Sequence, residues 1–159
     1  MSELAQNLSA SPLRRWPDWP GRLAAFLGTR AQAPFSWGSS DCCLFACDAV
    51  LEMTGTDLAA DFRGTYGCSR SALRVFHRAG GGLGRNGLRA IACGIAREEG
   101  IPEIAVRLAR PGDIVLLEAP GIQDEVLAIV TLDGLSLAAQ ASAGVVHLPR
   151  RLGVTAWRI

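Results

Sequence analysis

The segment from Asp41 to Thr54 constrains the fold most, because it has the pattern of a helix with almost no hydrophilic side. On a helical wheel at about 100° per residue, only Asp48 and Glu52 form a narrow polar strip beside Asp41. A helix that is apolar on nearly all sides is buried on nearly all sides. We therefore predict that this helix, with Asp41 as its N-cap and Gly55 just past its end, lies at the centre of the domain.

The remaining pattern predicts an α+β fold, with helices first and an antiparallel meander after them. The other predicted helices span residues 20–30, 69–78 and 86–99. Predicted strands span residues 104–107, 114–117, 125–131, 135–139, 145–148 and 154–158. Asp133-Gly134 is a hairpin signal between two of these strands.

Length and charge limit the classes of function. The 159 residues fit one domain, and we expect a polar tail over residues 1–15 and a single domain over 16–159. The net charge of +1 creates no long-range field for nucleic acid or an anionic membrane. The longest apolar runs, such as Val126 to Val130, are far shorter than the roughly 20 residues that span a bilayer. We therefore expect no nucleic acid partner and no membrane insertion.

The cysteine at the start of the central helix is the candidate nucleophile. Cys42 lies in the first predicted turn, directly after Asp41. A thiol there faces unpaired backbone N–H groups and the positive end of the helix dipole, and both favour the thiolate. Such a cysteine can be an activated nucleophile.

Two motifs resemble those of the NlpC-type cell-wall cysteine peptidases. The first is Trp37-Gly38-Ser39-Ser40-Asp41-Cys42, similar to a W-G-x-x-D-C stretch that leads into the family's central helix and supplies the attacking cysteine. The second is Pro111-Gly112-Asp113-Ile114-Val115, similar to the P-G-D-[IV]-V that opens the family's strands. The resemblance implies a papain-like fold, with a buried central helix packed on an antiparallel, partly closed sheet.

A closer resemblance runs nearly from end to end. It rests on Phe35-Ser36-Trp37-Gly38, Asp41-Cys42-Cys43-Leu44-Phe45-Ala46, Asp48-Ala49, Thr54-Gly55, Arg63-Gly64-Thr65-Tyr66 and Ala156-Trp157-Arg158-Ile159. These runs are similar to a phage and prophage family of uncharacterised NlpC-like tail proteins, which are encoded among tail-tip genes. The resemblance implies a protein made in the bacterial cytoplasm, located in the virion tail and in contact with other tail-tip proteins.

The chain departs from the peptidase pattern at the catalytic base. The peptidases place a histidine at the start of the strand after P-G-D-[IV]-V, and an alignment anchored on Asp133-Gly134 places Val126 there. The third catalytic position falls near Ala138, with Gln140 close by. Without an imidazole, acyl transfer loses its general acid and base. We therefore predict a non-catalytic structural protein in which Cys42 is a vestigial nucleophile.

Two alternatives remain open from the sequence. The first is an active cysteine hydrolase that cleaves peptidoglycan peptides during genome entry, with His147 or His77 as a substitute base. The second is a metal- or iron–sulfur-binding tail plug that draws ligands from Cys43, Cys47, Cys68, Cys93 and His77. We expect no metal or other cofactor, because mid-helix thiols within an apolar surface behave as small hydrophobic groups.

Two sets of residues are candidate partner contacts. Trp16 and Trp19 are large aromatic residues near the N-terminus, a residue type enriched in interfaces. Arg70, Arg74 and Arg78 recur every four residues along one side of a predicted helix. Such a row can bind phosphate or an acidic protein surface, although core packing of the tryptophans and a solvated arginine face are the simpler interpretations.

Overall fold

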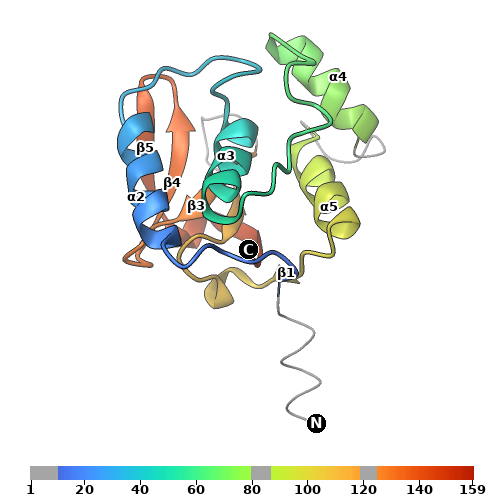
Figure 1. The fold of residues 1–159 in the computed structure, drawn as a ribbon. Coiled ribbons are helices and arrows are strands. Elements are labelled where there is room, and N and C mark those ends of the chain that lie inside the picture. Colours follow the sequence, from blue (N-terminus) through green and yellow to red (C-terminus); the bar gives the residue numbers. More distant parts are fainter. Residues whose placement is uncertain (1–10, 80–86, 119–124) are drawn as a thin grey trace.

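A computed structural model of the chain describes residues 11–79, 87–118 and 125–159. In these ranges four helices precede six strands (Figure 1). The helices are α2 (Trp19–Arg30), α3 (Cys42–Thr54), α4 (Ser69–Ala79) and α5 (Leu88–Glu98), with short 3-10 turns η1 (Val106–Leu108) and η2 (Arg150–Leu152). The strands are β1 (Glu103–Ile104), β2 (Ile114–Leu117), β3 (Val126–Val130), β4 (Ser136–Ala141), β5 (Gly144–Pro149) and β6 (Gly153–Trp157). The predicted α+β class is confirmed.

Helix α3 is the central element, as its composition predicts. The Asp41 side chain caps its N-terminus by accepting a hydrogen bond from the Leu44 N–H at 2.9 Å. Gly55 ends the helix in the left-handed conformation, with φ of 78°. Phe45 and its neighbours on almost every side are buried. Figure 1 shows α3 between α2 and α5, in front of the sheet.

The polar strip of α3 binds the surrounding segments. Asp48 forms ion pairs with Arg30 of α2 and with Arg63 of the segment that follows α3. Glu52, one turn later, is exposed. The single polar side of this helix therefore fixes two neighbouring segments through one carboxylate.

The six strands form one antiparallel sheet in the order β1-β6-β2-β3-β4-β5. The sheet is open, with β1 and β5 at its edges, whereas the sequence analysis expects it to be partly closed. β1 is only two residues long, so it offers little edge for pairing. Beside β5, the Val145 N–H donates to the Ala31 carbonyl at 3.3 Å, so the segment after α2 covers part of that edge.

One predicted strand is mostly absent. Of residues 104–107, only Ile104 belongs to a strand, and Val106 begins the 3-10 turn η1 instead. The Arg150 guanidinium, 44 positions along the chain, donates to the Val106 carbonyl at 2.7 Å and to the Ala109 carbonyl at 2.9 Å. This distant side chain binds carbonyl oxygens that in a strand would accept hydrogen bonds from a neighbouring strand.

The described part of the expected tail contacts the domain. Leu13 packs against the core, and Arg15 binds residues near the C-terminus. Residues 1–10 lie outside the described ranges. None of the helices in those ranges has both the length and the apolar character that a bilayer crossing requires.

Candidate functional site

The N-terminus of α3 is built around the Asp41 carboxylate. This buried group accepts hydrogen bonds from the Gly38 N–H at 2.9 Å, the Leu44 N–H at 2.9 Å and the Tyr66 hydroxyl at 2.7 Å. Gly38 has φ of 80°, and a Cβ added there would lie 2.0 Å from the Tyr66 carbonyl oxygen. Glycine is therefore required at this position, and the motif around Asp41 fixes the loop before the helix.

Tyr66 is a residue of this site that the sequence analysis assigned no role. In the sequence, Tyr66 stands out only as the last residue of Arg63-Gly64-Thr65-Tyr66, one of the runs that resemble the tail-protein family. Burial and the hydrogen bond to Asp41 raise the pKa of the Tyr66 hydroxyl above its ordinary range. The phenol therefore remains a neutral donor to a buried carboxylate.

Cys42 occupies the first turn of α3, but its thiol is buried. The residue is only 3% exposed. Burial, followed by the charge of Asp41, raises the pKa of the Cys42 thiol to about 12. The helix dipole favours a thiolate at this position, but the loss of hydration and the adjacent carboxylate outweigh it. The thiol that the sequence identifies as a candidate nucleophile is therefore neutral at physiological pH.

The thiol lies where two strands separate. β3 and β4 pair only at Ile129–Ala138 and Val130–Leu137. Ahead of these pairs, a hydrogen bond from the Leu127 backbone N–H reaches Cys42. Helix α3 thus places its first residue against the beginning of β3, which pairs with β2 but not with β4.

Leu127, and not Val126, is the β3 residue that faces α3. Leu127 lines a cavity together with Cys43 and Cys47 of α3. Successive side chains of a strand point to opposite faces, so Val126, paired with Leu117 on β2, points away from α3. The side chains at both positions are apolar, so neither supplies a proton acceptor to Cys42.

Neither histidine lies at the thiol. His147 is exposed on β5, pairs with Ala138 across the ladder, and has its Nδ1 3.4 Å from the Ser136 hydroxyl. β5 is two strands from β3, a separation of about 10 Å between strand axes. His77 is half-buried on α4. Among the described residues, no hydrogen bond or ion pair joins either imidazole to Cys42.

The residues at which the resemblance expects a third catalytic group are apolar or have structural partners. Ala138 is buried and has no polar side chain. The Gln140 amide donates to the Ala33 carbonyl at 2.7 Å and to the Ala141 carbonyl at 2.9 Å, and it accepts from the Ser40 hydroxyl at 3.4 Å. Gln140 therefore links β4 to the loop that leads into α3.

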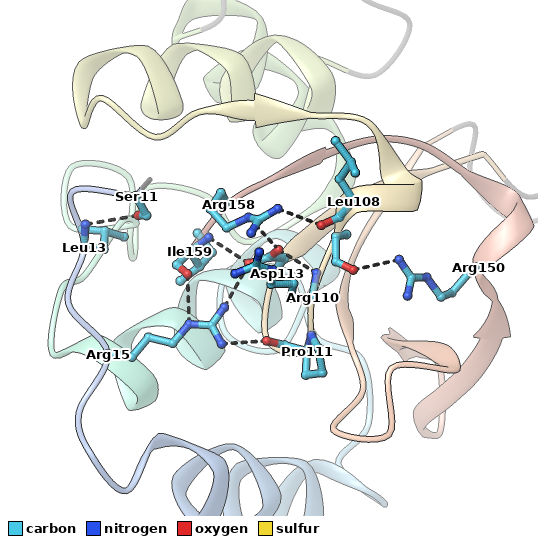
Figure 2. Close-up of polar contacts among 11 residues, drawn as sticks. Ser11, Leu13, Arg15, Leu108, Arg110, Pro111, Asp113, Arg150, Arg158 and Ile159 are labelled. Carbon is cyan, nitrogen blue, oxygen red and sulfur yellow. Dashed lines mark hydrogen bonds and ion pairs between the residues drawn. The ribbon is translucent and has the colours of Figure 1, made fainter. Parts of the chain in front are cut away.

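Asp113 of the second motif is the centre of another buried polar cluster (Figure 2). Its carboxylate accepts from the backbone N–H groups of Arg110 at 2.8 Å and Ile159 at 3.0 Å, and from the Arg15 guanidinium at 2.9 Å. The Arg158 guanidinium lies 3.3 Å from Oδ2 of Asp113, the oxygen that also accepts from the Arg110 N–H. Burial raises the pKa of Asp113, and these four groups oppose that shift. The cluster joins the two ends of the domain.

The remaining cysteines show no metal-binding arrangement. Cys43 and Cys47 are buried on α3, and the hydrogen bond between them together with burial raises the pKa of Cys43. Cys68 is exposed before α4, and Cys93 is half-buried on α5. Across the described ranges, no group of three or more histidine, cysteine or acidic side chains could hold a metal ion.

The candidate contact residues lie on the surface. Trp16 is 46% exposed, with the Arg22 guanidinium 5.8 Å from its ring centroid. Trp19 is half-buried beneath the Arg15 guanidinium, which is 4.3 Å from its ring. Arg70, Arg74 and Arg78 are all exposed on α4.

Comparison with known proteins gives one match. Residues 14–159 match a family described as "Domain of unknown function (DUF6950)". No curated protein matches the chain. No solved structure matches it either.

Proposed function

We propose that this chain, which belongs to the DUF6950 family, is a non-catalytic relative of the NlpC-type cysteine peptidases and a structural or assembly component of a bacteriophage tail tip. The observation that supports it most is the state of Cys42: a buried, neutral thiol that the Leu127 backbone N–H reaches and that no histidine imidazole among the described residues contacts by a hydrogen bond. The tail-tip assignment rests on the sequence resemblance described above.

The chemistry of acyl transfer explains why Cys42 is so informative. A cysteine hydrolase needs a thiolate that its substrate can reach and a base that returns a proton to the leaving amine. Cys42 is closed off from solvent, and burial favours its protonated form. Placing an amide carbon at this sulfur would require α3 and β3 to separate.

The residues of the two motifs have structural partners instead. Asp41 binds three donors at the start of α3, and Asp113 binds donors from the two ends of the domain. Groups of this kind stabilise a fold whether or not a reaction takes place. They support the interpretation of a retained scaffold. That its contacts are made with other tail-tip proteins in the virion tail follows from the sequence resemblance alone.

A peptidase assay tests the absence of catalysis. The wild-type chain and Cys42→Ala are compared on a fluorogenic muropeptide, and we expect the same background rate for both. Turnover that Cys42→Ala abolishes would contradict the proposal and identify an active hydrolase. Elemental analysis of anaerobically purified protein tests the metal-binding alternative, because a stoichiometric metal would support a plug subunit.

Complementation tests the tail role separately. A phage that lacks the gene is supplied with wild-type protein, with Cys42→Ala, or with Phe45→Asp, which buries an unpaired charge in the core and abolishes folding. We expect the first two to restore infectious particles with complete tail tips and the third to fail. Particles that assemble normally without the gene product would refute a structural role.

A further inference from the structure

We propose that the chain forms a two-fold dimer in which the arginine row of α4 in each copy binds an acidic cleft of the other. The arginine row is Arg70, Arg74 and Arg78. The acidic cleft lies between residues 57–62 and α5, and its rim carries Asp61, Glu98 and Glu99. This inference is independent of the proposed tail function and of the state of Cys42.

The arginine row has no ion-pair partner in the part of the chain that the structure describes. All three side chains are exposed, and α4 contains no aspartate or glutamate. No carboxylate in the described ranges forms an ion pair with any of them. Like charges four residues apart on a helix repel one another. The row is therefore an unpartnered cationic face whose repulsion an acidic surface would relieve.

The acidic cleft has the complementary character. It is about 320 Å³ in volume, and its apolar floor includes Leu58 and Ile95. Asp61, Glu98 and Glu99 are exposed, and no arginine in the described ranges forms an ion pair with them. In those ranges, no cluster of three or more acidic, histidine or cysteine side chains is arranged to hold a metal ion. The three carboxylates of the cleft therefore fit three separate guanidinium groups better than one metal cation.

The dimensions of the two surfaces agree. The row from Arg70 to Arg78 spans eight residues of helix, or about 12 Å. The cleft follows α5 from Ile91 to the end of the helix at Glu98 and includes the next residue, Glu99, a similar length of chain. Leu73, which lies next to Arg70 around α4 and about 100° from Arg74, is 41% exposed and provides an apolar contact at the border of the row.

The two surfaces are neighbours on the molecule. Ala79, the last residue of α4, lines the cleft, and α4 and α5 contact each other. Figure 1 shows both helices at the same side of the fold. A two-fold axis beside them brings each row to the other copy's cleft, which closes the assembly at two copies. This arrangement favours a second copy of the chain as the occupant.

Sedimentation velocity tests the dimer on the full chain. We expect a dimer at about 0.1 M salt, where the Debye length is about 10 Å, and dissociation at about 1 M, where it is about 3 Å. The row-reversed variant changes the three arginines of the row to glutamate. The cleft-reversed variant changes Asp61, Glu98 and Glu99 to arginine. Each alone is expected to weaken the dimer at least tenfold, with circular dichroism confirming its fold.

Mixing the two variants provides the decisive measurement. Each variant repels itself. In an equimolar mixture, the acidic row of one variant meets the basic cleft of the other, and at the second contact the native arginine row meets the native acidic cleft, so a dimer should return. The control, Arg107→Glu with Arg151→Glu, changes exposed arginines elsewhere and should leave the dimer intact. A wild-type chain that is monomeric at low salt refutes the proposal, as does a dimer that both reversals leave unchanged. A monomer that binds DNA through the row would refute it in favour of a nucleic acid partner.

Discussion

Alkaline pH should destabilise the fold through Cys42. The thiol has a pKa of about 12 in the folded chain, whereas an unfolded cysteine has a pKa of about 8.5. Between these values the unfolded chain releases the proton and the folded chain retains it. Because the unfolded state then binds fewer protons, the free energy of unfolding falls as pH rises through this window.

The size of the effect follows from the two pKa values. Each pH unit above the unfolded pKa costs about 1.4 kcal/mol for one group. Between pH 7 and pH 10, Cys42 alone should therefore remove about 2 kcal/mol from the free energy of unfolding. Cys43, whose pKa is also raised, adds a loss of the same sign.

Urea unfolding under reducing conditions measures the contribution of Cys42. The wild-type chain and Cys42→Ala are compared at several values from pH 7 to pH 10. Cys42→Ala loses packing contacts, a cost that does not depend on pH, and it also loses the titrating thiol. Between pH 7 and pH 10 we therefore expect its free energy of unfolding to fall by about 2 kcal/mol less than that of the wild-type chain. Cys68→Ala, which changes an exposed thiol, should retain the steep dependence of the wild-type chain.

Two results would refute this reasoning. The first is an identical pH dependence for the wild-type chain and Cys42→Ala. The second is alkylation of Cys42 in the folded chain with a midpoint near or below pH 8.5. Either would mean that the thiol is hydrated or activated, and the proposed absence of catalysis would lose its main support.

Two further predictions concern the surroundings of this thiol. Tyr66→Phe removes one of the three donors to the Asp41 carboxylate and should lower the free energy of unfolding by about 1.5–3 kcal/mol in urea titrations, since hydrogen bonds to charged groups contribute that much. An unchanged midpoint would contradict it. Leu127→His directs an imidazole toward α3 and should accelerate iodoacetamide labelling of Cys42 near neutral pH, whereas Val126→His directs one away and should not. Equal labelling of both variants would contradict the assigned strand face.

Local features made much of the fold predictable from the sequence. Asp41, Gly55 and the apolar circumference between them define α3 without reference to any other segment. Asp133-Gly134 and the apolar runs on either side define the central strands in the same way. The prediction of a strand around Val106 was wrong, because the guanidinium of Arg150, far along the chain, binds the Val106 carbonyl.

The chemistry at Cys42 was less predictable, because two tertiary effects decide it. The local argument from the helix dipole favours a thiolate, but burial against β3 reverses the direction of the pKa shift. Which side chains of β3 point toward α3 also depends on the register of the strand, since a shift of one residue exchanges its two faces. Alignment on Asp133-Gly134 selects Val126, whereas the ladder directs Leu127 toward α3.

The W-G-x-x-D-C motif therefore stabilises the fold of this chain, through the hydrogen bonds of its aspartate. Removing the Asp41 carboxylate would leave the Gly38 N–H, the Leu44 N–H and the Tyr66 hydroxyl without their acceptor in a buried setting, and such losses destabilise a fold strongly. Stability alone gives a reason for an aspartate at this position, whether or not the chain catalyses a reaction. What would separate an enzyme from a scaffold is a base beside the sulfur of Cys42, and among the described residues neither imidazole forms a hydrogen bond with that sulfur.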